Sequence, residues 1–199
     1  MIGCKSDLRA FLVKAASKRG TCDIAVSKML CLHLPSLIPQ HFSAIDVASP
    51  VQTAAVTGAG LLFQGSSHRM MTEFLLAEMG RRPESDVTLD REAYTLSCGI
   101  ALGMVNIGKG DRVAGGSGAG EGLDDLNIAE RLYRYIVGGT DESEVQRTRE
   151  ANDRQNVPSA SSSGENERCS CVFEGDAINI DVTAAGATLA LGLIFFRSG

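Results

Sequence analysis

An apolar segment rich in small residues occurs three times in this chain, and it limits the possible fold more than any other feature of the sequence. The copies are AAVTGAGLLFQG at residues 54–65, SCGIALGMVNIG at residues 97–108 and GATLALGLIFFR at residues 186–197. Aligned without gaps, they place Gly60, Gly103 and Gly192 at one position, with two large apolar residues after each glycine. Such a repeat comes before any other pattern, because it sets the architecture of the whole chain.

Each copy is expected to form a buried α-helix. No copy carries a charge before Arg197, and a helix that is apolar on nearly every side is typical of a protein interior. Each glycine costs roughly 1 kcal/mol relative to alanine in a helix interior. Small residues four apart, such as Ala54 and Gly58, allow a neighbouring helix to approach closely and offset that cost. The copies therefore predict stacked helices. A single buried helix with incidental glycines is the simpler alternative.

An amphipathic outer helix is expected after each buried helix and its glycine turn. Ser66 or Ser67 is predicted to cap a helix over residues 68–79. Gly80 is expected in the left-handed conformation at its end, before Pro83. The spacing predicts one apolar face, with Glu73 and Glu78 elsewhere, formed by Met70, Met71, Phe74, Leu75 and Met79.

The flanking units follow the same plan with more variation. Residues 8–20 resemble a degenerate earlier copy, and Asp23 is predicted to cap the following helix over residues 24–33. In the second unit, Asn127 with Glu130 forms a start similar to a capping box. The alternation of apolar and polar residues from Ile178 predicts a short extended segment before the third copy.

These patterns predict an all-α protein, an α-solenoid of paired helices. Gly60 and Gly103 lie about 43 residues apart, a spacing typical of helical-pair repeats. The expected units cover about residues 8–34, 51–82, 90–139 and 176–199, with flexible loops at about residues 109–125 and 140–174. The second loop is polar and serine-rich, so we expect it to be disordered and modifiable at residues 159–163. Since the chain ends just after a buried helix, we expect a piece of a longer array.

Composition argues against several classes of function. The formal net charge of -5 disfavours nucleic acid as a partner, and an aromatic share of 5% disfavours a stacking platform for single strands. Six cysteines at unrelated spacings indicate free thiols in a reducing, intracellular compartment. The uncharged stretch at residues 182–196 is shorter than the roughly 20 residues that span a bilayer. A membrane tail anchor is therefore only an alternative.

The sequence contains no complete set of residues for a catalytic, metal-binding or nucleotide-binding site. GGSGAGEG at residues 115–122 has neither the flanking strand and helix nor the lysine of a phosphate-binding loop, and GAG at residues 58–60 falls within a helix. Structural or solvated roles are expected for His33, His41, His68, Cys169, Cys171, Ser17, Ser67, Glu73, Glu78, Asp124 and Asp125. We predict no catalytic residue, cofactor, metal or small-molecule substrate. A nucleotide-binding enzyme that uses residues 115–122 is the alternative.

Several strings outside the two loops resemble one known family. They are KAASKRGT at 14–21, VQTAAVTGAGLLFQGSSHR at 51–69, LLAEMGRRP at 75–83, DREAYTLSCGIALGMVNIGKG at 90–110, LNIAERLYRYIVGG at 126–139 and GDAINIDVTAAGATLALGLIFF at 175–196. The alternation of helices resembles the proteasome/cyclosome repeat. The strings, in order, are similar to the largest subunits of anaphase-promoting complexes. The resemblance covers nearly all of the chain outside the loops.

The resemblance implies a non-catalytic scaffold. In that family the repeats close into a ring-like solenoid, a toroid, within a subunit that holds together a ubiquitin ligase of the cell cycle. The implied partners are the other subunits of the anaphase-promoting complex, without nucleic acid or membrane, in the nucleus and cytoplasm. The alternative within the repeat family is a scaffold subunit of the proteasome regulatory base. That subunit shares the repeat but not SKRGT at 17–21 or SSHR at 66–69.

Overall fold

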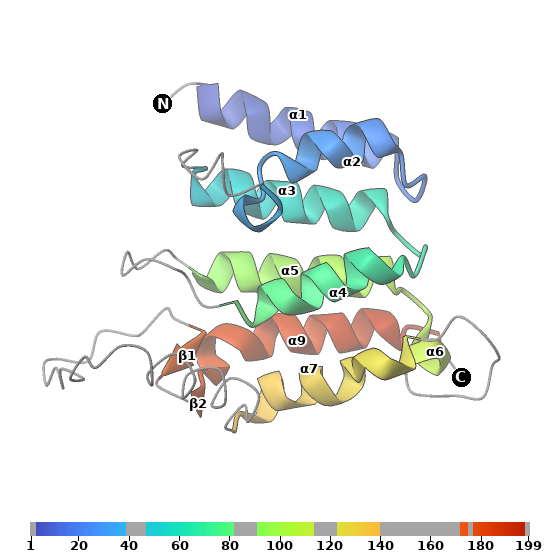
Figure 1. Cartoon of the computed structure of the whole chain (residues 1–199), viewed down its shortest axis with the longest axis vertical. Coiled ribbons are helices and arrows are strands. Elements are labelled where there is room, and N and C mark those ends of the chain that lie inside the picture. Colours follow the sequence, from blue (N-terminus) through green and yellow to red (C-terminus); the bar gives the residue numbers. More distant parts are fainter. Residues whose placement is uncertain are drawn as a thin grey trace, which may run out of the picture.

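Four helices that contain the repeated segments lie side by side in a row (Figure 1). The computed structural model describes residues 3–38, 47–81, 91–113, 123–139, 172–174 and 177–197. The inner helices pack in chain order, each against the next, as α1 (Gly3–Ser17), α3 (Ser49–Leu62), α5 (Arg91–Val105) and α9 (Ile180–Ile194). The predicted stacking of the segments around Gly60, Gly103 and Gly192 is therefore confirmed.

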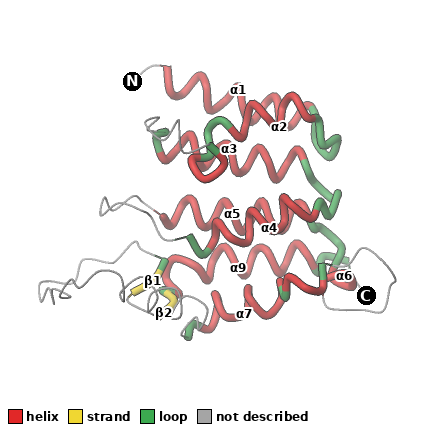
Figure 2. Tube along the Cα trace, in the orientation of Figure 1, coloured by secondary structure: helices red, strands yellow, loops and turns green. Residues whose placement is uncertain are grey.

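Three shorter helices form a second row beside the inner one (Figure 1). They are α2 (Ile24–Cys31), α4 (Arg69–Met79) and α7 (Ile128–Val137). Helix α2 packs on α3, α4 packs on α5 and α7 packs on α9. The described chain is almost entirely helical (Figure 2), which confirms the all-α class. Apart from loops and turns, the described residues also form two short strands, β1 (Phe173–Glu174) and β2 (Ala177–Ile178), which pair antiparallel.

The inner helices meet through small residues in one repeated register. A Cβ atom added to Gly60 of α3 would lie 2.6 Å from Cα of Ala101 in α5, closer than real Cβ atoms approach. A Cβ atom added to Gly103 of α5 would lie 2.8 Å from Cβ of Leu193 and 3.1 Å from Cα of Ala190 in α9. Because Ala101 and Ala190 occupy equivalent places in their copies, the two interfaces use the same positions. Each glycine is required by the close approach of the next helix.

Backbone hydrogen bonds repeat from one inner helix to the next. The third residue after α1, α3 and α5 is a glycine with a positive φ, between 67° and 69°, at Gly20, Gly65 and Gly108. Their N–H groups donate to the carbonyl oxygens of Leu61, Met104 and Leu193 at 3.1, 2.9 and 3.1 Å, respectively. These carbonyls lie in the last turns of α3, α5 and α9, and each also accepts from the N–H group three residues later, at 3.2–3.4 Å. The turns thus tie neighbouring units together at equivalent places.

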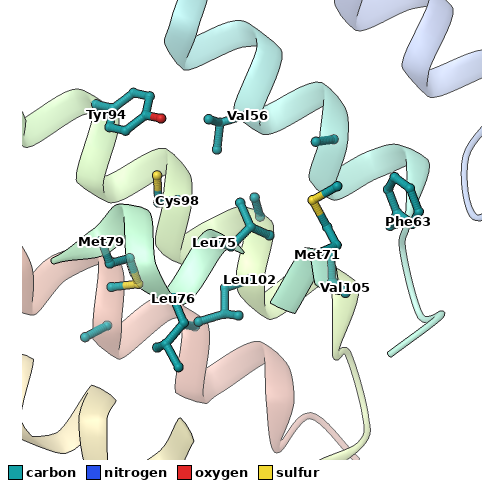
Figure 3. Close-up of a cluster of buried hydrophobic side chains, with 14 of the residues drawn as sticks. Val56, Phe63, Met71, Leu75, Leu76, Met79, Tyr94, Cys98, Leu102 and Val105 are labelled. Atoms are coloured by element: carbon teal, nitrogen blue, oxygen red, sulfur yellow. The ribbon is translucent and has the colours of Figure 1, made fainter. Parts of the chain in front are cut away.

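Apolar side chains of α4 pack against the inner helix α5. Leu75, Leu76 and Met79 are fully buried. Figure 3 shows them in one cluster with Cys98 and Leu102 of α5. Leu75 and Met79 lie on the buried face, as the sequence predicts. Met70, which the same prediction placed on this face, is instead 73% exposed. The buried side of α4 therefore begins at Met71, and it includes Thr72, Leu76 and Glu78, which the prediction does not place there.

Helix ends agree only in part with the predicted caps. The carboxylate of Asp23 accepts from the N–H groups of Ala25 and Val26 at 3.0 and 3.1 Å, so the predicted cap of α2 is confirmed. For α4 the predicted serine caps are wrong, because Nδ1 of His68 accepts from the N–H of Met71. Gly80 has a φ of -100°, so the predicted left-handed end is also wrong.

Other predicted boundaries differ from the structure. Asn127 precedes α7 with a φ of 46° and makes no side-chain cap, so the predicted capping box is wrong. The expected loop at residues 109–125 contains helix α6 (Gly110–Val113) and the start of the 3₁₀ turn η3 (Asp124–Leu126). Its middle, and residues 140–171 of the second expected loop, lie outside the described residues. Among the helices that are described, none combines the length and apolar character that crossing a membrane requires.

Candidate interaction surfaces

The predicted polar residues do not gather into one site. His33 packs against Phe11, with ring centroids 4.4 Å apart, and His68 packs against Phe63 at 4.9 Å. His41, Cys169, Cys171 and the glycine-rich segment at residues 115–122 lie outside the described residues. Within the described ranges, no three His, Cys, Asp or Glu side chains are grouped closely enough to hold a metal ion. The histidines that the structure describes therefore have packing roles.

Two of the predicted acidic residues form surface ion pairs. Glu73 accepts from Nε of Arg69 at 2.9 Å. Asp125 of η3 accepts two hydrogen bonds from the same guanidinium group, which lowers the pKa of Asp125. Ser17 donates to the carbonyl oxygen of Lys14 at 2.8 Å. None of these contacts orients a nucleophile. The contacts of Arg69 instead link α4 to η3.

Glu78 is the exception among the predicted solvated residues, because it is only 3% exposed. Its carboxylate accepts from the hydroxyl of Tyr94 at 2.7 Å and pairs with Nε of Arg81 at 2.6 Å. The guanidinium of Arg91 lies 5.0 Å from the centre of the Tyr94 ring. Burial raises the pKa of Tyr94 well above its ordinary value. The hydrogen bond from Tyr94 thus joins α5 to α4 at a buried carboxylate, which is also paired with the exposed Arg81.

The sequence contained a signal for this buried carboxylate. Glu78 lies seven residues after Met71 and three after Leu75, which places it on the buried side of α4. Glutamate is almost never fully buried without a partner, and this led to the prediction of a solvated residue. Its partner Tyr94 lies in another helix, and the pairing of the two helices is visible only in the structure.

The outward side of α9 forms a first candidate surface, which we call the α9 face and define by Thr188, Leu189, Gly192 and Phe196. All four residues are exposed. Gly192 is equivalent to Gly60 and Gly103, yet among the described residues no atom lies within 4 Å of a Cβ added to it. The α9 face thus has the residue pattern of an inner-helix interface without an occupant among the described residues.

A cavity of about 350 Å³ between α2 and α4 forms a second candidate surface. Its deeper wall includes Phe63 and Met71, which are buried, and its rim includes Ile24 and Met70, which are 70% and 73% exposed. Figure 3 shows Met71 extending from α4 toward the end of α3 where Phe63 lies. Exposed large apolar residues around an apolar hollow are typical of an interaction site rather than of a free surface.

Comparison with known proteins gives one consistent family. The family model described as APC1 fifth domain matches residues 24–199. Anaphase-promoting complex subunit 1 of Homo sapiens is 41% identical over 186 residues, which cover 92% of this chain and 8% of the human protein. The protein of the same name from Dictyostelium discoideum is 34% identical, over 92% of this chain and 10% of its own length.

A relative with a different name agrees with this result. The protein named Negative regulator of mitosis from Emericella nidulans is 30% identical over 189 residues, which cover 92% of this chain and 7% of that protein. The chain therefore spans about a tenth or less of the length of these relatives. The match to the family model includes α2 to α9, and hence both candidate surfaces. This chain belongs to the family of anaphase-promoting complex subunit 1.

Proposed function

We propose that this chain is a segment of an α-solenoid of proteasome/cyclosome-type repeats, and that it acts as a non-catalytic scaffold in an anaphase-promoting complex. In this role it would bind other subunits of the ubiquitin ligase through protein–protein contacts, in the nucleus and cytoplasm, and would contribute to cell-cycle control. Membership in the subunit 1 family favours this complex over the proteasome regulatory base. The alternative of a nucleotide-binding enzyme rests on residues 115–122, which lie outside the described residues.

The repeated register of the inner helices is the observation that carries the proposal. A Cβ atom added to Gly58 would lie 3.4 Å from Cβ of Ala15. When the earlier copy is aligned by matching Gly20 with Gly65, Ala15 takes the place of Gly60. The α1–α3 interface therefore uses the same pair of positions as the α3–α5 and α5–α9 interfaces. An arrangement in which each unit contacts only its neighbours, by the same rule, is the defining property of a solenoid.

Both ends of the inner row support continuation of the array. Gly192 on α9 holds the position that receives the next helix at Gly60 and Gly103. When Gly20 is aligned with Gly65, Val13 of α1 takes the position that Ala101 and Ala190 have in the later copies. Val13 is 68% exposed. We propose that the α9 face receives a further inner helix of the full-length protein, with a small residue opposite Gly192. A large apolar residue three positions later would be equivalent to Met104 and Leu193.

The test is a Gly192→Leu substitution in the full-length protein, followed by affinity purification from dividing cells. If a further helix packs on the α9 face, the added side chain separates the two helices. The recovery of cullin and RING subunits should then fall by more than half. Arg131→Leu introduces the same side chain at an exposed position of α7 and is expected to leave recovery unchanged. Equal recovery with both variants would contradict the proposed scaffold contact.

A further inference from the structure

The cavity between α2 and α4 exists because the first outer helix is short. Helix α2 has 8 residues and α4 has 11, so α2 is shorter by about 4–5 Å at 1.5 Å per residue. Pro35 follows α2, and the chain then turns through η1 (Pro35–Leu37). Leu37 comes to line the cavity at this turn. The two outer helices pack on different inner helices, and the space between them stays open.

The walls of the cavity are held in place by the inner turn. The ring of His68 packs against Phe63 in a tilted arrangement and also caps α4, so two contacts hold it in position. The hydroxyl of Ser66 accepts from the N–H of His68 at 3.3 Å. The lining is mainly apolar, and it comprises Cys22, Ile24, Ser27, Lys28, Leu37, Phe63, His68, Met70, Met71 and Phe74. A preformed apolar hollow of this kind loses little conformational entropy when it is occupied.

One positive charge at this cavity has no opposite charge to neutralise it in the described structure. Lys28 is the lysine of the lining, and no ion pair involves it among the described residues. The neighbouring acidic groups already have cationic partners, since Asp23 pairs with Lys18 at 3.5 Å and Glu73 with Arg69 at 2.9 Å. The ammonium group of Lys28 therefore offers an ion pair to an incoming carboxylate and disfavours a basic segment.

We infer that this cavity binds a short acidic segment of a partner protein, which inserts one large apolar side chain between Ile24 and Met70 and places a carboxylate beside Lys28. The volume of about 350 Å³ lies at the low end of the range for ligand pockets. It accommodates an anchor side chain rather than a complete helix. The inference rests on the proposed scaffold role, because a scaffold has to offer surfaces beyond those that join its own repeats.

Site-specific photo-cross-linking in the full-length protein tests this inference. A benzoylphenylalanine in place of Met70 is irradiated in the purified native assembly, and the cross-linked peptide is identified by mass spectrometry. Tyr133, which is 61% exposed on α7 and outside the cavity, carries the same probe as the matched control. We expect a cross-link specific to position 70, to a segment with a large apolar residue and a carboxylate within four residues of each other.

The cross-linked segment is then synthesised, and its affinity for the full-length protein is measured by fluorescence anisotropy. Ile24→Asp is expected to weaken binding at least tenfold, because the anchor loses its apolar rim. Lys28→Glu should weaken binding about fivefold, the range of an exposed ion pair. Tyr133→Asp should have no effect. These substitutions fall on exposed side chains, so the fold should tolerate them.

Three results would overturn the inference. They are a basic cross-linked segment, a signal at position 70 no stronger than at position 133, and an affinity that Lys28→Glu leaves unchanged. If any of these occurs while Gly192→Leu still reduces the recovery of cullin and RING subunits, the scaffold role stands and the cavity does not serve it. If Gly192→Leu has no effect and the acidic segment still binds, the cavity is a binding site and the proposed continuation of the array fails.

Discussion

Single glycines set the distance between the inner helices. The closest approach is between α5 and α9, where a Cβ atom added to Gly99 would overlap the backbone of Gly186. A Cβ atom added to Gly186 would in turn lie 2.8 Å from the carbonyl oxygen of Thr95. These contacts involve backbone atoms, which cannot move without shifting a whole helix. The loss of helix propensity at glycine is thus offset by packing that no larger residue allows.

Gly99→Ala is expected to lower the free energy of unfolding by about 1–3 kcal/mol, as overpacking in a close-packed core usually does. This loss should appear even though alanine is the better helix former by roughly 1 kcal/mol. Urea denaturation followed by circular dichroism measures it. Ser97→Ala, at a half-buried position of the same helix, is the control and should stay within about 0.5 kcal/mol of the wild type. An equally stable Gly99→Ala protein would contradict the close approach.

A second residue-scale prediction concerns the hydrogen bond from Tyr94 to Glu78. Burial, followed by the neighbouring Cys98 and Glu78, raises the pKa of Tyr94. The unfolded chain therefore loses this proton first, near pH 10. Above that pH the free energy of unfolding should fall by about 1.4 kcal/mol per pH unit from this group alone. Burial also raises the pKa of Cys98, which adds a loss in the same direction.

Tyr94→Phe separates these contributions. At neutral pH it should cost about 1–3 kcal/mol, because Glu78 loses a buried donor. Above pH 10 the free energy of unfolding of the Tyr94→Phe protein should fall less steeply with pH, by about the 1.4 kcal/mol per pH unit that one tyrosine contributes. Tyr133→Phe removes an exposed hydroxyl and should change neither value. Urea titrations between pH 7 and 11 provide the comparison, and parallel alkaline declines for wild type and Tyr94→Phe would rule out this explanation.

At the scale of elements, inner helices were easier to predict than helix ends. The stacking of α3, α5 and α9 follows from the apolar, small-residue pattern, which is local to each segment. The start of α4 depends instead on contacts between units, since the N–H of Ser67 donates to the carbonyl oxygen of Val105. Ser66 donates its hydroxyl to the carbonyl oxygen of Phe63, and His68 becomes the cap. No pattern within residues 66–79 contains that information.

The ion pair between Arg69 and Asp125 joins α4 to the turn before α7, and its contribution should depend on salt. Asp125→Asn is expected to lower the melting temperature at low ionic strength. In 1 M salt the difference should nearly vanish, because the screening length falls to about 3 Å. The hydrogen bond from Arg69 lowers the pKa of Asp125, so this contribution is present above about pH 4 and disappears as the pH falls further.

Asp124→Asn is the matched control for this pair, because Asp124 is exposed in the same turn. Thermal unfolding by circular dichroism at two salt concentrations makes the comparison. A salt-independent deficit in the Asp125→Asn protein would mean that the residue acts through the turn backbone rather than through its charge.

For the whole molecule, the sequence alone predicts the row of inner helices and the family but not the two surfaces. The glycine positions repeat in the sequence, so their stacking could be expected from residues such as Gly60 and Gly103. The cavity arises from the different lengths of two outer helices that lie side by side only after folding. Buried Glu78 likewise depends on Tyr94 from another helix. Features that involve two units at once are therefore the part that sequence patterns do not predict.

The central claim is that the inner helices meet in one register, in which Gly60 and Gly103 each receive the next helix, and that Gly192 is the open instance of this position. The most direct test compares the unfolding free energies of Gly103→Ala and Gly192→Ala in this chain by urea denaturation. Gly103→Ala should lose about 1–3 kcal/mol, since its Cβ atom would lie 2.8 Å from Cβ of Leu193. Gly192→Ala should gain roughly 0.5–1 kcal/mol, because alanine favours the helix and meets no described atom. Effects of the same sign at both positions would contradict the account.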